Sequence, residues 1–115
     1  YLRLVEARDL DAASEFLADD VSIVFPGGRT FESLTDQVAS SAGRFRSVKK
    51  TLDHLDVVSD GAETTVYVYG TLAGQALDGS PFDGVRFIDR FALNDGLIVS
   101  QMVWNDLAEV GALPA

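Results

Sequence analysis

The sequence lacks cysteine altogether and has one histidine, one methionine, one tryptophan and 3 prolines among its 115 residues. The absence of cysteine excludes disulfides and thiolate metal sites. The single histidine, His54, has no clear set of metal ligands around it. We therefore expect no metal site and no cofactor, with His54 exposed or at an interface.

Long apolar runs are absent as well. No stretch approaches the roughly 18 residues that a helix needs to cross a membrane, and no secretory signal is visible. We expect no membrane association and a cytoplasmic location. The sequence starts at Tyr1 and not at a methionine, which leaves a preceding targeting segment open.

Basic residues are scarce, with 9 against 18 acids and a net charge of −9. A field of that sign repels phosphate backbones, so no nucleic-acid partner is expected. Four of the bases gather in one stretch, and two interpretations of it stay open: the solvated end of a helix, or a local contact with an anion or a partner. The four are Arg44, Arg46, Lys49 and Lys50.

What the chain does contain is enough for one folded unit. Apolar residues make up 47% of the sequence and charged residues 23%, which is typical of a globular chain and not of a disordered one. The length predicts a single domain over residues 1–115.

The first half of the chain is predicted to be mainly helical. One short helix ends near Arg8, and Asp9 caps a second helix that closes at Asp19-Asp20. Phe16 and Leu17 are expected on its buried side. Ser33, with Asp36 three residues on, predicts the start of a third helix.

The remaining segments favour β-strands. Val21 to Phe25 is rich in β-branched and aromatic residues, a Pro-Gly-Gly turn follows, and residues 29–31 can return beside it. Further on, Asp-Gly pairs at 60, 78 and 95 separate four runs with strand character, which is a strong hairpin signal. We expect an antiparallel meander from residues 48–58, 63–74, 85–93 and 97–105.

Helices first and an antiparallel sheet afterwards predict an α+β domain. Helices that lie on one face of a strongly curved sheet enclose a conical space, and such a space is a candidate ligand pocket.

Six short segments carry further information through their order and spacing. They are Asp9-Leu10-Asp11-Ala12, Leu17-Ala18-Asp19-Asp20-Val21, Phe25-Pro26-Gly27, Arg86-Phe87-Ile88-Asp89-Arg90-Phe91, Asp95-Gly96-Leu97-Ile98 and Trp104-Asn105-Asp106.

Together these segments resemble the nuclear transport factor 2-like superfamily, which includes the ketosteroid isomerases and the SnoaL-like polyketide cyclases. The resemblance covers nearly the whole chain and implies the cone-shaped α+β fold of that superfamily. It implies little about activity, because the superfamily also contains dehydratases, epoxide hydrolases and non-catalytic modules.

Asp89 is the first candidate catalytic residue. Residues alternate between the two faces of a strand, so Asp89 shares one face with Val85, Phe87 and Phe91. A carboxylate among aromatic side chains is costly unless it is paired, hydrogen-bonded or protonated. It is either a pocket acid that donates or orients a proton, or a buried structural acid, and both interpretations stay open.

The resemblance to ketosteroid isomerases allows three of their catalytic positions to be compared with this sequence. Their general base, an Asp before a proline, corresponds to Phe25, which cannot take a proton. That argues against steroid isomerisation by their mechanism and for an apolar pocket floor. Their oxyanion-binding tyrosine corresponds to Tyr1, either a hydrogen-bond donor to a ligand or merely the end of a helix. Their second donor, a protonated Asp, corresponds to Phe87 or Asp89.

Other branches of the superfamily point to Asp106. It matches a final-strand Asp of the limonene epoxide hydrolases, but the Arg and Asp partners of that residue would fall near Tyr69 and Thr71 and are missing. SnoaL-like cyclases carry their acid near Val103, which is also missing. Asp106 is thus a supporting catalytic residue, a strand-end cap or part of a pocket rim.

An apolar, planar ligand is expected in the cone. By analogy with the isomerases, Ser100, Met102 and Trp104 line it, and the two tyrosines Tyr67 and Tyr69 offer polar groups in the pocket or across an interface. The expected lining is Phe25, Phe87, Phe91, Tyr67, Tyr69, Met102 and Trp104.

The opposite face of the sheet also has apolar side chains. Ile88 lies between Arg86 and Arg90, and Val99 and Val103 are expected beside it. An exposed apolar face of this kind favours association, and the superfamily commonly dimerises there. We expect a homodimer.

Two functions remain open. The first is a cofactor-free acid/base enzyme, of the isomerase, cyclase or lyase type, that acts on a small apolar cyclic compound through Asp89, Tyr1 and Asp106. The second is a non-catalytic module for small-molecule binding or dimerisation.

Overall fold

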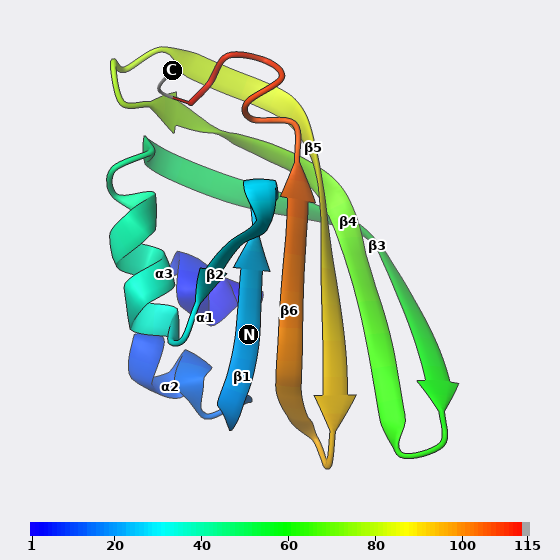
Figure 1. Cartoon of the computed structure of the whole chain (residues 1–115). Coiled ribbons are helices and arrows are strands. Elements are labelled where there is room, and N and C mark those ends of the chain that lie inside the picture. The colour runs from blue at the N-terminus through cyan, green and yellow to red at the C-terminus, as the bar shows by residue number, and fades with distance from the viewer. Residues whose placement is uncertain (114–115) are drawn as a thin grey trace.

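The computed structural model describes residues 1–113, and its main element is a six-stranded mixed sheet (Figure 1). The strand order is β2-β1-β6-β5-β4-β3. The last four strands form the expected antiparallel meander, whereas β1 runs parallel to β6. The strands are β1 (Leu17–Phe25), β2 (Arg29–Phe31), β3 (Phe45–Asp60), β4 (Glu63–Ala76), β5 (Pro81–Asn94) and β6 (Leu97–Asn105).

Within residues 1–113, three short α-helices precede or interrupt the sheet: α1 (Leu2–Glu6), α2 (Leu10–Ser14) and α3 (Leu34–Ser41). A 3-10 helix, η1 (Pro26–Gly28), joins β1 to β2. The two predicted N-caps are confirmed, since the Asp9 side chain accepts from the Ala12 amide and the Ser33 hydroxyl accepts from the Asp36 amide. Among the described residues, no helix is long and apolar enough to cross a membrane.

The predicted end of the second helix is wrong. Helix α2 stops at Ser14, and Asp19 and Asp20 lie inside β1. Phe16 is exposed, and its carbonyl oxygen accepts from the amide of Ile98 at 2.7 Å. The chain leaves the helix early because this backbone pairs in parallel with β6, a long-range contact that local sequence patterns do not reveal.

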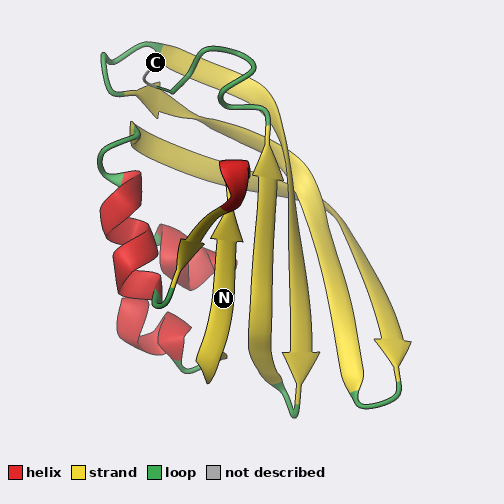
Figure 2. Ribbon diagram, in the orientation of Figure 1, coloured by secondary structure: helices red, strands yellow, loops and turns green. Residues whose placement is uncertain are grey.

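The helices cover one face of the sheet, and the long strands β3, β4 and β5 curve around that side (Figures 1 and 2). Two glycines of β4 allow β3 to approach closely. A Cβ at Gly70 would overlap the carbonyl oxygen of Thr51, and one at Gly74 would overlap that of Ser47. Close backbone approach is a common reason for glycine within a strand.

The face toward the helices, called the inner face below, carries the core. In β5 it presents Val85, Phe87, Asp89 and Phe91, all of them buried. The two partners of Asp89 on the neighbouring strands, Val68 and Val103, are also buried. The inner face is therefore an apolar layer with one carboxylate at its centre.

The fold is thus the α+β cone expected from the sequence. A curved sheet with N-terminal helices on its concave side leaves room between the two layers, and that room contains the candidate site.

Candidate functional site

Asp89 lies at the centre of the inner face with 0% of its surface exposed. Its Oδ2 is 2.7 Å from the Nζ of Lys50. Among residues 1–113, its Oδ1 finds no hydrogen-bond partner. Since a buried carboxylate is stable only when paired, the ammonium of Lys50 explains how an acid survives among Val68, Phe87 and Val103.

Lys50 is a site residue that the sequence analysis missed. It lies on β3 rather than at a helix end, and its Nζ is also 4.9 Å from the ring centroid of Phe87, a cation–π distance. Its backbone amide donates to the Oε2 of Glu6 on α1 at 3.1 Å. The available signal was the alternation of Val48, Lys50 and Leu52, which places Lys50 on an apolar strand face.

Tyr1, the residue that the resemblance assigns as a hydrogen-bond donor, is the N-cap of α1 and packs against the sheet. Its hydroxyl donates to the Oε1 of Gln101 at 3.4 Å, and its ring meets Phe91 edge to face at 5.9 Å. Burial, and then the negative charge of Asp89, raise the pKa of Tyr1 to about 12. The phenol therefore stays protonated and able to donate at neutral pH.

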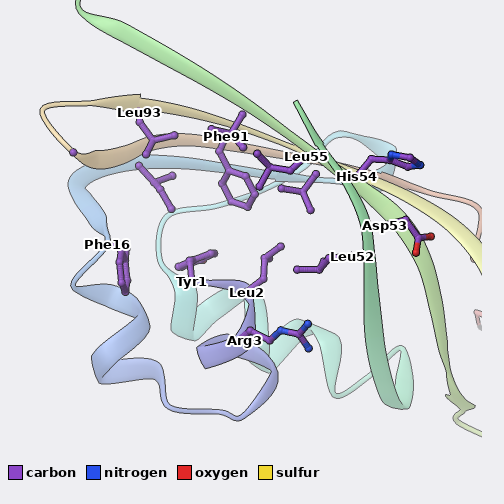
Figure 3. A pocket seen from close by; sticks show the side chains of 14 residues that line it. Tyr1, Leu2, Arg3, Phe16, Leu52, Asp53, His54, Leu55, Phe91 and Leu93 are labelled. Atoms are coloured by element: carbon purple, nitrogen blue, oxygen red, sulfur yellow. The ribbon is translucent and has the colours of Figure 1, made fainter. Parts of the chain in front are cut away.

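Three adjoining cavities run between the helices and the inner face. The largest, called the apolar cavity, is about 510 Å³ and lies between α1 and strands β3 to β5 (Figure 3). In Figure 3, Tyr1 and Leu2 approach it from the helix, with Phe91 and Leu55 on the other side. It opens to solvent beside Leu55, which is 62% exposed.

The second cavity, called the polar cavity, is about 90 Å³ and shares Tyr1 and Leu2 with the apolar cavity. Its polar lining is Tyr1, Glu6, Arg8, Gln37, Ser41, Lys50 and Gln101.

The third cavity, called the cationic cavity, is about 60 Å³ and shares Lys50 and Phe25 with the polar one. It lies between the end of α3 and the start of β3. Its lining includes Arg29, Arg44 and Lys50. Both smaller cavities are thus more polar than the apolar cavity, and the cationic cavity has the most basic side chains.

The predicted lining residues divide between the two faces of the sheet. Phe25 and Phe87 line the cationic cavity, and Phe91 lines the apolar cavity, so these three lie inside the cone as expected.

Met102 and Trp104 lie on the opposite, outer face, contrary to the expectation that they face the cone. Tyr67 and Tyr69 lie there too, so of the two positions left open for them the pocket is wrong. Trp104 pairs with Ile88 and Met102 with Arg90, one position out of phase with Asp89. The analogy with the isomerases was wrong by one residue, and a shift of one residue moves every side chain to the other face. For the same reason Val103, expected outside, is buried inside.

Asp106 also lies away from Asp89. Its Oδ2 accepts from the Nε of Arg86 at 2.7 Å, and it borders a broad hollow of about 1220 Å³ on the outer face. The hollow is also lined by Tyr67, Tyr69 and Trp104. The three predicted catalytic residues therefore do not meet: Asp89 lies on the inner face and Tyr1 packs against that face, whereas Asp106 lies on the outer side of the sheet.

His54 stacks on Tyr69 at the outer hollow, with ring centroids 5.0 Å apart. The hydroxyl of Tyr69 donates to the Oδ2 of Asp56 at 2.9 Å, and this hydrogen bond raises the pKa of Tyr69. Within residues 1–113, no three His, Cys, Asp or Glu side chains gather to hold a metal ion.

The chemistry that the inner site can perform centres on the polar cavity. Asp89 itself borders none of the three cavities, and its contact with them runs through Lys50. The carboxylate that does border the polar cavity is Glu6. The site therefore offers an acceptor (Glu6), a neutral donor (Tyr1) and a cation fixed by a buried acid (Lys50).

This is a cone-shaped α+β protein whose enclosed site lies between N-terminal helices and a curved sheet. The sequence profile of the SnoaL-like domain matches residues 1–101, and the chain belongs to that family within the nuclear transport factor 2-like superfamily.

Solved structures of other proteins have the same fold. An NTF2-like protein of unknown function from Burkholderia pseudomallei superposes with a TM-score of 0.73 at 19% identity, covering 94% of this chain and 86% of its own. TerC, co-crystallised with polyporic acid, gives 0.76 at 16% identity, covering 96% and 89%. Aln2 from a Streptomyces species gives 0.69 at 15%, covering 96% and 86%. At such identities the likeness establishes the fold alone.

A comparison with curated proteins found no match.

Proposed function

We propose that the domain binds a small apolar ring compound in the apolar cavity, with an oxygen of the ligand directed at the Tyr1 hydroxyl. The observation that carries the proposal is that Tyr1 borders both the apolar and the polar cavity. A volume of about 510 Å³ falls within the range of small-molecule sites.

The hydroxyl of Tyr1 is available for such a ligand. Its contact with Gln101 is long, at 3.4 Å, so exchanging it for a ligand oxygen costs little. It is protonated at neutral pH, because even the ordinary pKa of 10.0 lies well above 7 and the pKa of Tyr1 is higher still. Among the structural neighbours, TerC was co-crystallised with polyporic acid, which supports the use of this fold for a small organic ligand.

The test compares p-cresol with toluene, which differ by one hydroxyl, in NMR titrations. The variant Leu55→Asp puts a charge at the mouth of the apolar cavity and should lower the affinity for both compounds at least tenfold. The matched control is Val58→Asp, since Val58 is similarly exposed at 54% on the same strand but pairs with Thr65 on the outer face. Equal affinity in the two variants would remove the apolar cavity as the site.

The role of Tyr1 is tested separately. Tyr1→Phe should weaken p-cresol roughly fivefold, since a hydrogen bond is worth about 1 kcal/mol, and should leave toluene unchanged. If toluene loses as much as p-cresol, the hydroxyl does not contact the ligand.

A second candidate function is acid/base catalysis, favoured by the polar cavity next to the ring site. In this scheme the Glu6 carboxylate takes a proton from the carbon next to a carbonyl. The enolate oxygen that forms accepts hydrogen bonds from Tyr1 and Lys50, and the proton returns from Glu6 to carbon. Asp89 acts as a positioning residue, because it holds Lys50 without touching the ligand.

Exchange of the α-protons of 2-tetralone for deuterium in D₂O, followed by NMR, tests this scheme without knowledge of the natural substrate. Catalysed exchange that Glu6→Gln abolishes supports the enzyme. The control is Glu15→Gln, since Glu15 is an exposed residue after α2. If the protein exchanges the α-protons no faster than buffer does, the catalytic function is excluded and only the binding function remains.

We also propose that two copies associate through the outer face. Its hollow combines aromatic residues, including Trp104 at 47% exposure, with charges of both signs in Arg86 and Asp106. A two-fold interface needs such a self-complementary surface. Light scattering at micromolar concentration should give twice 12.4 kDa, and Trp104→Asp should give the monomer mass. A wild-type monomer would contradict the proposal.

A further inference from the structure

The cationic cavity has a charge pattern that the proposed function does not use. In a chain with a net charge of −9, this cavity is bordered by Arg29, Arg44 and Lys50, and by no carboxylate side chain of residues 1–113. Its remaining lining is apolar or neutral and includes Phe25, Phe45, Ser41 and Asn105.

The three cations are not equally compensated. Lys50 is neutralised by Asp89 at 2.7 Å. Across residues 1–113, ion pairs are found for Lys50 and Arg86, and neither Arg29 nor Arg44 has a carboxylate within 4.0 Å. The two arginines therefore form an uncompensated positive site at the end of the cone.

The side chain of Arg29 is held in place by hydrogen bonds that leave some of its N–H donors available. Its Nε donates to the carbonyl oxygen of Pro26 and its Nη1 to the hydroxyl of Ser40, each at 3.3 Å. Its guanidinium lies 5.7 Å from the ring centroid of Phe31. A guanidinium has five N–H donors, so three remain for a ligand on a side chain that is already ordered.

The two guanidinium groups also act on each other. Burial, and then the positive charge of Arg44, lower the pKa of Arg29. Two like charges without a counter-ion are unfavourable, and an anion between them relieves the repulsion. Arg is well suited to that role because it binds carboxylates with paired hydrogen bonds.

We propose that the cationic cavity binds the carboxylate of a small organic acid between Arg29 and Arg44, with the apolar part of the acid against Phe25 and Phe45. Its volume is about 60 Å³, several times the roughly 10–15 Å³ that one water needs in a cavity measured in this way. That room suits a carboxylate with a short chain and not a polyphosphate. The site is separate from the one proposed around Tyr1 and goes beyond it.

The test is an NMR titration of propionate against propionamide, which has the same shape but no charge, at constant ionic strength. Propionate should shift the amides around the cavity and the Nε–H signals of Arg29 and Arg44, whereas propionamide should not. Equal responses to the two compounds would overturn the proposal. Equal shifts with sulfate would do the same, because they would reveal a general anion effect.

The variant Arg44→Gln should weaken propionate at least tenfold. The matched control is Arg46→Gln, which removes the same charge. Arg46 is exposed on β3 and lies outside the cavity lining. Identical affinity in both variants would overturn the proposal. If Arg44→Gln fails to fold, the arginine Nε–H shifts of the wild type decide alone.

Leu55→Asp separates this inference from the proposed function. It should leave propionate binding unchanged while p-cresol binding is lost. Loss of both in that variant would show that the cavities are one site and would overturn the separate carboxylate position.

Discussion

Two ion pairs of equal length flank strand β5, one on each face of the sheet. On the inner face the Nζ of Lys50 is 2.7 Å from Asp89, and on the outer face the Nε of Arg86 is 2.7 Å from Asp106. They differ in surroundings: the side chain of Asp89 is 0% exposed and that of Lys50 21%, whereas that of Arg86 is 84% exposed.

The difference shows that distance alone does not define a functional ion pair. Water screens the outer pair, so its net contribution is small. The inner pair has little screening, and each partner depends on the other to compensate the loss of hydration. Only the inner pair can therefore hold a cation fixed at the wall of a cavity.

The largest expected effect comes from removing the inner cation. Lys50→Met leaves Asp89 buried without a counter-charge and should lower the free energy of unfolding by about 3 kcal/mol. This value is at the low end for buried ion pairs, because the side chain of Lys50 is partly exposed. Urea denaturation measures this. The control Lys49→Met, one residue along and exposed, should change it by less than about 0.5 kcal/mol.

The double variant Lys50→Met/Asp89→Leu sharpens this prediction. Replacing both charges with apolar groups should recover most of the lost stability, because the cost lies in the orphaned carboxylate. A loss in Lys50→Met below about 1 kcal/mol would mean that water reaches Asp89 and that the two pairs are alike.

An intermediate effect is expected from the titration of Tyr1. Its pKa is raised from 10.0 to about 12, so the fold favours the neutral phenol. This stabilisation is complete below pH 10 and is lost as the pH rises from 10 to 12. At about 1.4 kcal/mol per pH unit, less a discount for partial exposure, the loss is about 1–2 kcal/mol.

Absorbance at 295 nm across this range, compared between the wild type and Tyr1→Phe, isolates the Tyr1 signal. The difference should show one phenol that ionises near pH 12, and Tyr1→Phe should lose less stability between pH 9 and 11.5. A difference that titrates near pH 10 would place Tyr1 in water and remove it from the inner site.

The smallest effect is expected for the outer pair. Arg86→Gln should cost no more than about 0.5 kcal/mol in the free energy of unfolding, and 1 M salt should reduce even that. A loss above about 2 kcal/mol would instead mean that the pair is buried in the protein's association state, and it should then depend on protein concentration.

Much of the local structure follows from the sequence. Asp9 and Ser33 cap helices because their side chains satisfy free amides of the next turn. The Asp60-Gly61 and Asp95-Gly96 turns separate strands because Asp and Gly tolerate positive φ there: 63° at Gly61, 52° at Asp95 and 78° at Gly96. Each of these interactions joins residues that are close together in the chain, so it can be predicted from the local sequence.

The site was less accessible to sequence reasoning. The alternation in β5 correctly placed Asp89 on a buried face, but no local rule links it to Lys50, which is 39 positions away. The face of β6 was predicted by analogy and was wrong by one residue, because register depends on long-range pairing and not on the strand's own sequence.

By itself the sequence determined most of the elements and the burial of one acid in β5, since these follow from caps, turns and the period of apolar residues. The cone-shaped fold was implied by the resemblance to a known superfamily. The tertiary structure alone decided that Asp89 is paired, that Glu6 and Tyr1 lie beside Lys50, and that Arg29 and Arg44 remain uncompensated. Those contacts join segments far apart in the chain, and electrostatic energy depends on the distance and burial that only folding fixes.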